Sequence, residues 1–189
     1  MAHDPMVLPA NLPRPVDDGA ADHLTGSSVP SVELPATSGE LIDLNAASAG
    51  RRLVIFAYPR TGRPDEDLPT ADWDAIPGAR GCTPEACSFR DLHTEMQAAG
   101  ADVAGLSTQV TTDQKETAHR LHVPYPLLSD YRLELTRALA LPTLEVAGLV
   151  MLRRLTMVLR DGLVEHVWYP VFPPDTHATE VVTWLQLRH

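Results

Sequence analysis

A continuous apolar stretch at residues 53–58 (LVIFAY) constrains the fold of this chain more than any other feature. A strand that is apolar at every position is buried on both faces, so it belongs in the middle of a sheet. The stretch is far too short to cross a bilayer, which takes about 20 apolar residues. We therefore expect residues 53–58 to form the central strand of a globular domain.

The segments around this strand alternate between strand and helix patterns. Further strands are expected within residues 31–44 and at residues 103–106, 125–128, 149–159 and 163–169. Helices are expected at residues 84–99, 112–121, 131–139 and 175–187. Asp161 and Gly162 form a typical hairpin turn between the last two strands. The pattern predicts an α/β fold with a central mixed sheet flanked by helices, which is compatible with a thioredoxin-like architecture.

The chain has 189 residues, enough for one domain with a sizeable core. Residues 1–30 are rich in Pro, Asp, Gly and Ser, so we expect an irregular N-terminal arm followed by a single domain at residues 31–189. No basic segment followed by an apolar one opens the sequence, which predicts a cytoplasmic location. The formal net charge of −10 argues against nucleic-acid and anionic-membrane partners.

The chain has only two cysteines, Cys82 and Cys87. A secreted disulfide scaffold normally carries more cysteines in a smaller chain, so a catalytic or metal-binding role is favoured. A zinc site needs four ligands, and only His93 lies nearby in sequence, so we expect no metal. Two unremarkable cysteines on an amphipathic helix would show the same spacing.

The spacing of the two cysteines has a geometric consequence. Cys82 lies at the start of a predicted helix, where free N–H groups and the positive end of the helix lower a thiol pKa from its usual ~8.5. Cys87 follows five residues later, which on an ideal helix means ~140° of rotation and ~7.5 Å of rise. The sulfurs then lie beyond disulfide reach. A bond between them would require the first helical turns to unwind.

Residues 81–91 (GCTPEACSFRD) closely resemble the catalytic motif of the Q-type peroxiredoxins, also called bacterioferritin comigratory proteins. The resemblance covers roughly residues 30–161 and includes YPLLSD at residues 125–130. It implies a thioredoxin-like fold and the reduction of hydrogen peroxide and organic hydroperoxides by a monomer or homodimer without a cofactor. It also implies that Cys82 is the peroxidatic cysteine and Cys87 the resolving cysteine. The two form an intramolecular disulfide, which thioredoxin or a similar dithiol protein reduces.

The resemblance also assigns two supporting side chains. The family has an Arg-x-Thr-Phe-like pattern on a late strand, and residues 154–157 (RLTM) fit it with Met in place of Phe. Arg153 and Arg154 must face opposite ways on a strand, and Arg154 shares its face with Thr156. A pair of solvent-facing arginines is the alternative. The family glutamate three residues after the peroxidatic cysteine maps onto Glu85, which would orient the arginine as a charge-assisted partner.

The sequence departs from the family before Cys82. The usual pattern is Pro-x-x-x-Thr-x-x-Cys, but the residue three positions before Cys82 is Ala79, which has no hydroxyl. An atypical insertion separates Pro59 from Cys82. Thr61 is expected to supply the missing hydroxyl if the loop folds back, and Thr83 is the other candidate. The insertion itself is expected to form a lid or an oligomer contact.

A second function would use the same residues. The chain would then be a non-enzymatic redox sensor, in which disulfide formation changes the helix and exposes a surface to a partner protein. Fast peroxide consumption with a thiol donor favours the enzyme. Oxidation without turnover favours the sensor.

Overall fold

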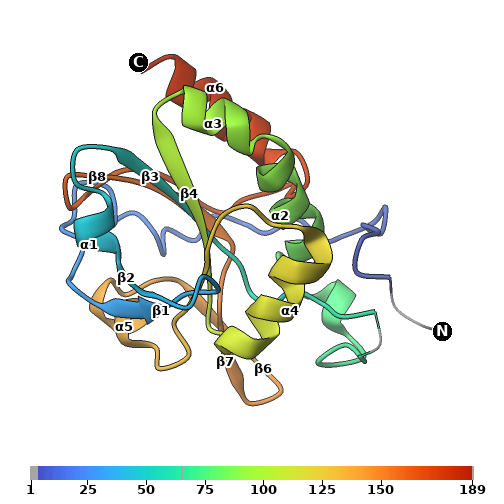
Figure 1. Cartoon of the computed structure of the whole chain (residues 1–189). Helices are drawn as coiled ribbons and strands as arrows, with labels where there is room; N and C mark the ends of the chain where they lie inside the picture. Colours follow the sequence, from blue (N-terminus) through green and yellow to red (C-terminus); the bar gives the residue numbers. More distant parts are fainter. Residues whose placement is uncertain (1–3, 65, 189) are drawn as a thin grey trace.

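The computed structural model describes residues 4–64 and 66–188. A mixed sheet of five strands in the order β5-β4-β3-β8-β9 forms its centre (Figure 1). Strand β3 is the middle strand, as the apolar stretch predicted; it runs parallel to β4 and antiparallel to β8. The bounds of the five strands are β3 (Arg52–Ala57), β4 (Ala101–Ser107), β5 (Leu127–Ser129), β8 (Leu155–Arg160) and β9 (Leu163–Trp168).

Helices and hairpins cover both faces of the sheet. One face carries the hairpin of β1 (Glu33–Pro35) and β2 (Leu41–Asp43) together with α1 (Leu44–Ala47) and α5 (Glu134–Ala138). The other face carries α2 (Cys82–Asp91), α3 (His93–Ala98), α4 (Thr111–Leu121) and α6 (His177–Gln186). A second hairpin, β6 (Thr143–Val146) and β7 (Leu149–Leu152), stands apart from the central sheet, and the insertion contains a short 3-10 helix, η1 (Trp73–Ala75).

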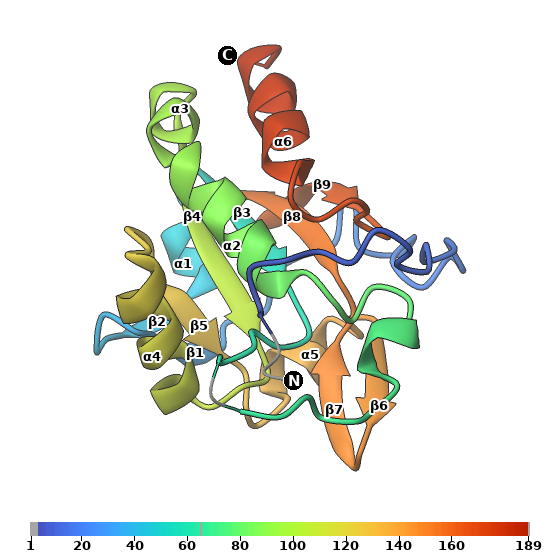
Figure 2. The ribbon, with the colours of Figure 1, turned by 90° about the vertical axis from the view of Figure 1, so that its right-hand side faces the viewer.

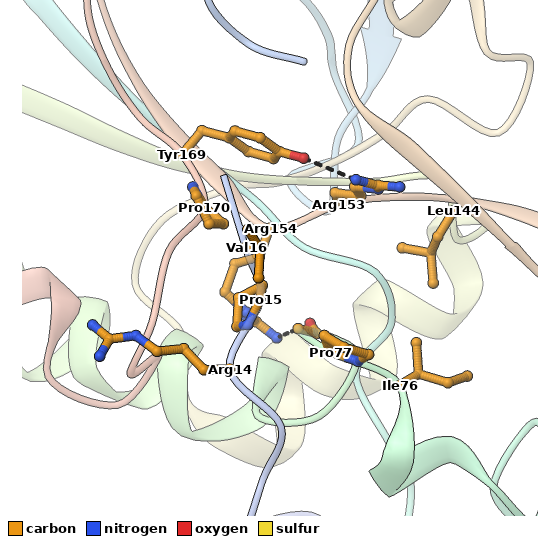
Figure 3. A pocket seen from close by; sticks show the side chains of 11 residues that line it. Arg14, Pro15, Val16, Ile76, Pro77, Leu144, Arg153, Arg154, Tyr169 and Pro170 are labelled. Carbon is orange, nitrogen blue, oxygen red and sulfur yellow. Dashed lines mark hydrogen bonds between the residues drawn. The ribbon is translucent and has the colours of Figure 1, made fainter. Parts of the chain in front are cut away.

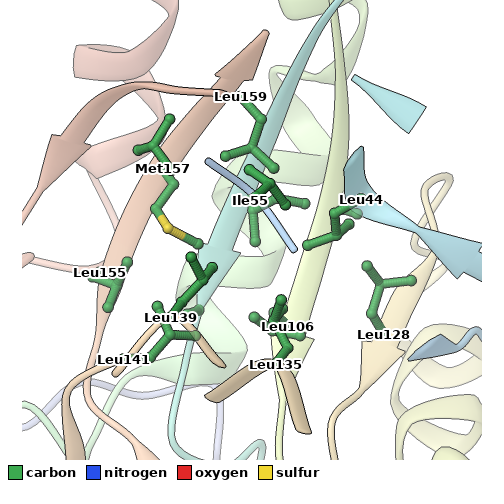
Figure 4. Packing of buried hydrophobic residues seen from close by; sticks show 14 of the residues in the cluster. Leu44, Ile55, Leu106, Leu128, Leu135, Leu139, Leu141, Leu155, Met157 and Leu159 are labelled. Carbon is green, nitrogen blue, oxygen red and sulfur yellow. The ribbon is translucent and has the colours of Figure 1, made fainter. Parts of the chain in front are cut away.

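Side chains of β3 divide between two hydrophobic clusters, one on each face of the sheet. Ile55 belongs to the cluster that contains Leu106, Leu135 and Met157, which Figure 4 shows. Phe56 belongs to the opposite cluster, under α2 and α6. Successive side chains of a strand point to opposite faces, so one apolar strand fills both clusters. Each fully buried side chain of this size stabilises the fold by roughly 1.5–3 kcal/mol.

Two predicted elements are each divided in two. The expected helix at residues 84–99 begins earlier, at Cys82, and breaks at Leu92 into α2 and α3, although Phe89 and Met96 still reach the same cluster. The expected strand at residues 149–159 is β7 and β8, separated by Arg153 and Arg154. Strand β7 pairs with β6, whereas β8 pairs with β3 and β9, so the chain must change direction between the two sheets.

A third predicted element is shorter than expected. The helix expected at residues 131–139 begins only at Glu134, because Leu133 has a left-handed backbone with φ 59°. The carboxylate of Asp130 accepts hydrogen bonds from the backbone N–H groups of Glu134, Leu135 and Thr136. These bonds satisfy the free donors of the first turn and place the helix start.

The described part of the N-terminal arm, from residue 4 on, contacts the rest of the chain at several points. Leu24 and Val29 are buried in the cluster around Ile55, and the backbone N–H of Gly26 donates to the carbonyl of Val164. The described start of the arm passes in front of α2 (Figure 2), with Leu8 against Gly81. The domain boundary at residue 30 stays a prediction. No helix within residues 4–64 and 66–188 combines the length and the apolar character that a membrane crossing requires.

Candidate active site

Cys82 is the first residue of α2 and is almost fully buried, with 2% of its surface exposed. The preceding residue, Gly81, has a φ of 104°, which favours glycine. A Cβ atom there would lie 2.5 Å from Cγ of Pro174 and 3.0 Å from Cδ2 of Leu8. Only glycine therefore lets the chain turn into the helix under this cover.

Arg154 and Glu85 complete the surroundings of the sulfur, and both are buried. Nη2 of Arg154 donates to Sγ of Cys82 at 3.2 Å, and Nη1 donates to Oε2 of Glu85. The same Nη2 also donates to the carbonyl oxygens of Gly78, at 3.3 Å, and Arg80, at 3.1 Å. Three of the residues singled out in the sequence thus meet in one hydrogen-bonded group.

Arg153 points away from this group, as the strand alternation predicted. Its guanidinium contacts Asp18 and the hydroxyl of Tyr169. The side chain of Arg153 is 42% exposed, whereas that of Arg154 is 2% exposed. Both arginines lie in the break between β7 and β8, and not within one strand as the alternation assumed.

The charge state of Cys82 depends on opposing influences. Burial raises the pKa of the Cys82 thiol above its usual value, while the Arg154 guanidinium and the backbone N–H of Arg60 lower it. The expectation of a lowered pKa from the helix end alone is thus wrong for this closed state, because desolvation outweighs the nearby donors. Burial likewise raises the pKa of Glu85 to about 7, against the opposing charge of Arg154.

Thr61 is buried, and the hydrogen bonds of its hydroxyl go to residues other than Cys82. Its hydroxyl donates to Oε1 of Gln109 at 3.1 Å and lies 2.9 Å from Oγ1 of Thr117. Among the described residues, no hydrogen bond joins Thr61 to Cys82. The sequence did not identify Gln109 or Thr117, because both are about 50 positions away along the chain. Thr83, the other candidate, is also buried.

Cys87 lies on the same helix and, like Cys82, is a free thiol. Burial raises its pKa, and the charges of Arg90 and Asp91 act on it in opposite directions. Two contacts anchor α2 beyond its first turn. The ring of Phe89 stacks on Phe56 with centroids 4.3 Å apart, and the hydroxyl of Tyr125 donates to the carbonyl of Ala86 at 2.7 Å.

The insertion at residues 60–80 packs against the hairpin of β6 and β7. Trp73 is buried with Ala79 and Met151, and Ile76 and Leu144 pack against this small cluster. The N-terminal arm contacts the insertion, because the guanidinium of Arg80 donates hydrogen bonds to the backbone carbonyls of Asp4 and Val7. Leu8 of the arm and Pro174 lie against Gly81, and Cys82 itself belongs to the hydrophobic cluster under α2.

A pocket of about 310 Å³ lies between the arm, the insertion and the β6-β7 hairpin (Figure 3). Arg154 forms part of its wall, but Cys82 is not among its lining residues. The lining consists of Arg14, Pro15, Val16, Ile76, Pro77, Gly78, Leu144, Arg153, Arg154, Tyr169 and Pro170. Cys82 therefore has no open path to solvent through this pocket unless the covering segments move.

His177, at the start of α6, predicts an acid-sensitive fold. It is 4% exposed; its Nε2 lies 3.0 Å from Oγ1 of Thr156 and its Nδ1 3.3 Å from Oε2 of Glu180. Burial lowers its pKa from 6.5 to about 4, with the charge of Arg154 acting the same way. Between these values the unfolded chain binds more protons, so stability is full above pH 6.5 and falls as the pH decreases through this window.

We expect His177 to cost the wild type about 3 kcal/mol of unfolding free energy on acidification from pH 7.5 to 4.5. The variant His177→Gln cannot take up a proton at this position. Between the same two pH values, its loss of unfolding free energy should therefore be smaller than that of the wild type by this amount. Chemical unfolding at both pH values measures the difference, with the exposed His119→Gln as the control. Equal losses in wild type and His177→Gln would contradict the prediction.

Comparisons with known proteins agree with this arrangement. The Redoxin family model matches residues 24–183. Peroxiredoxin bcp1 of Schizosaccharomyces pombe is 34% identical over 137 residues, which cover 71% of this chain and 62% of that protein. The chloroplastic peroxiredoxin Q of Oryza sativa subsp. japonica is 27% identical over 161 residues, which cover 85% and 66%. The chain thus spans less than two thirds of either relative.

The fold comparison points the same way. The crystal structure of peroxidoxin BcpB from Mycobacterium tuberculosis superposes with a TM-score of 0.71 at 29% identity, covering 88% of this chain and 98% of that one. This confirms the predicted thioredoxin-like fold with a central mixed sheet. Together with the match over residues 24–183, it shows that the chain belongs to the redoxin family and, within it, to the Q-type peroxiredoxins.

Proposed function

We propose that the chain is a thiol-dependent peroxidase that reduces hydrogen peroxide and organic hydroperoxides through Cys82. One observation carries the proposal: a buried guanidinium, Arg154, donates to the Cys82 sulfur at 3.2 Å where a helix begins. A structural cysteine in a core has no need of a cation held against its sulfur, whereas a nucleophilic thiolate does. Family membership supports the same activity.

The first chemical step forms a sulfenic acid. The Cys82 thiol gives its proton to water, and the thiolate attacks one oxygen of the hydroperoxide. An S–O bond forms as the O–O bond breaks, and the departing oxygen takes up a proton to leave as water or an alcohol. Arg154 and the backbone N–H of Arg60 stabilise the negative charge during this step. Glu85 holds the guanidinium in place.

The second step forms the disulfide. The sulfur of Cys87 attacks the sulfenic sulfur of Cys82, and the sulfenic oxygen leaves as water. Both residues lie on one helix, so the first turn of α2 must unwind before the sulfurs can meet. Unwinding breaks the hydrogen bond from the backbone N–H of Glu85 to the carbonyl of Gly81 and separates Cys82 from Arg154. The end of α2 can stay helical, because the stacking of Phe89 on Phe56 holds it in place.

A dithiol protein then reduces the disulfide back to two thiols, and we infer that thioredoxin or a similar protein is this partner. The atoms balance because each turnover consumes one hydroperoxide and two thiols of the reductant. We infer a monomer or homodimer in the cytoplasm. The acidic chain makes nucleic acid an improbable partner on charge alone.

The variant Cys87→Ser tests the order of these steps. Cys82 should still react with hydrogen peroxide at close to the wild-type rate, because Cys87 takes no part in the attack. The sulfenic acid should then accumulate at one per chain, and turnover with thioredoxin should fall at least about tenfold. Stopped-flow fluorescence measures the oxidation, and mass mapping after trapping with dimedone locates the modified sulfur.

The neighbouring variant Ser88→Ala is the matched control and should keep both the oxidation and the turnover of the wild type. Full turnover in Cys87→Ser would remove Cys87 from the mechanism. Oxidation of the wild type without turnover on any dithiol donor would favour the redox sensor instead.

A further inference from the structure

The place usually held by a threonine hydroxyl before the peroxidatic cysteine is filled differently in this chain. Ala79 stands three positions before Cys82, and the hydroxyl of Thr61 is turned toward α4. What faces the sulfur from this segment is the backbone N–H of Arg60, which favours the ionised sulfur. The turn at residues 59–62 therefore acts through its main chain.

This turn is clamped at three points. The hydroxyl of Ser107, at the end of β4, donates to the carbonyl of Pro59 at 3.1 Å. Oε1 of Gln109 accepts from both the backbone N–H and the hydroxyl of Thr61, at 2.9 and 3.1 Å. Nη2 of Arg120 donates to the carbonyl of Gly62 at 2.9 Å. Arg60 is thus fixed from both sides.

The central clamp is buried and its hydrogen bonds have a defined direction. Thr61, Gln109 and Thr117 are 3%, 8% and 1% exposed. The single hydroxyl proton of Thr61 goes to Gln109, so Thr117 must donate to Thr61 at 2.9 Å. Gln109 is held through its main chain as well, because its backbone carbonyl accepts a hydrogen bond from the hydroxyl of Ser129 at 2.6 Å. Buried, fully paired polar groups of this kind fix a single local geometry.

We propose that Gln109 and Thr117 are positioning residues, which hold the turn at residues 59–62 so that the Arg60 N–H stays aimed at the Cys82 sulfur. The inference rests on the proposed peroxidase function. Neither residue touches the sulfur. Their effect is to keep a main-chain donor preorganised at the point where negative charge develops.

The side chain of Arg60 does not take this role. It points to Glu66 and Asp113, with nearest nitrogen–oxygen separations of 3.7 and 3.9 Å, and is about a quarter exposed. The amide is therefore the group of Arg60 that the clamp controls.

The test compares Thr117→Val, which keeps the shape of the side chain, with Thr117→Ser, which keeps the hydroxyl. The readout is the second-order rate of Cys82 oxidation by hydrogen peroxide as a function of pH, in single turnover. In Thr117→Val we expect a rate about tenfold lower and a pH profile whose midpoint moves to higher pH, because the ionised sulfur loses a fixed donor. Thr117→Ser should restore both values. Gln109→Met should behave like Thr117→Val.

A variant elsewhere separates positioning from loss of stability. Thr136→Val removes another buried threonine hydroxyl, which donates to Asp130 on the opposite face of the sheet. It should lower the thermal midpoint without moving the pH profile. An unmoved profile in both Thr117→Val and Gln109→Met would overturn the inference. Absence of Cys82 oxidation in the wild type would instead overturn the peroxidase function, so the two failures are distinguishable.

Discussion

Replacing Cys82 with serine is expected to abolish peroxide turnover, with a loss of at least about 1,000-fold. A serine hydroxyl stays protonated at neutral pH and does not form a stable oxidised product with peroxide, so neither the attack nor the sulfenic acid is available. The fold should be kept, because the substitution exchanges sulfur for oxygen in a site that already offers Arg154 as a donor. Peroxide consumption with thioredoxin as the thiol donor is the measurement.

The contrast with Cys87→Ser makes this result specific. Cys87→Ser keeps one round of oxidation, whereas Cys82→Ser should show none, even though Cys87 remains a free thiol. Circular dichroism and a thermal midpoint close to the wild type exclude unfolding as the cause. Normal turnover by Cys82→Ser would show that the reactive sulfur is elsewhere, and the assignment would fail.

The substitution Arg154→Met is expected to slow the oxidation of Cys82 by about 100- to 1,000-fold. Removing one preorganised donor of an oxyanion site has a cost of this size. Arg154 directs one donor at the sulfur, and Glu85 fixes the guanidinium on its other side. The pH midpoint of the reaction should also rise, since the charge of Arg154 lowers the pKa of Cys82. Single-turnover stopped-flow kinetics measure both quantities.

The same substitution should also cost stability, by about 3 kcal/mol, because it leaves Glu85 buried without its cation. The double variant Glu85→Gln/Arg154→Met removes the unpaired carboxylate and should regain part of that free energy without regaining the rate. Arg153→Met is the matched control: its partly exposed contacts are worth little, so the rate with hydrogen peroxide should stay within about twofold of wild type. A normal rate in Arg154→Met would separate this arginine from the chemistry.

Properties encoded within a short window of sequence were predictable. The apolar run at residues 53–58 identified the middle strand, since burial on both faces needs no knowledge of what covers them. The Asp161-Gly162 pair identified the hairpin of β8 and β9. The spacing of Cys82 and Cys87 and the helix that carries both were visible for the same reason, because helical periodicity is a local property.

Long-range contacts were not predictable from such windows. The sequence predicted one strand at residues 149–159, because both halves of this segment are rich in apolar residues. In the structure the first half pairs with β6 and the second half with β3. The hydroxyl of Thr61 was expected at the sulfur, and it binds Gln109 and Thr117 instead. No pattern connects residues so far apart, since only the fold brings α4 against the segment that follows β3.

The sequence by itself determined which groups are available: two thiols five residues apart, an arginine two residues before Thr156, and a glutamate one helical turn from the first thiol. The tertiary structure alone decided their electrostatics. Burial raises the pKa of Cys82, and the groups packed around it, which include Phe56 of β3 and Arg154, come from distant parts of the chain. Desolvation depends on everything packed around a group, so it is a property of the folded chain and not of the residues beside it in sequence.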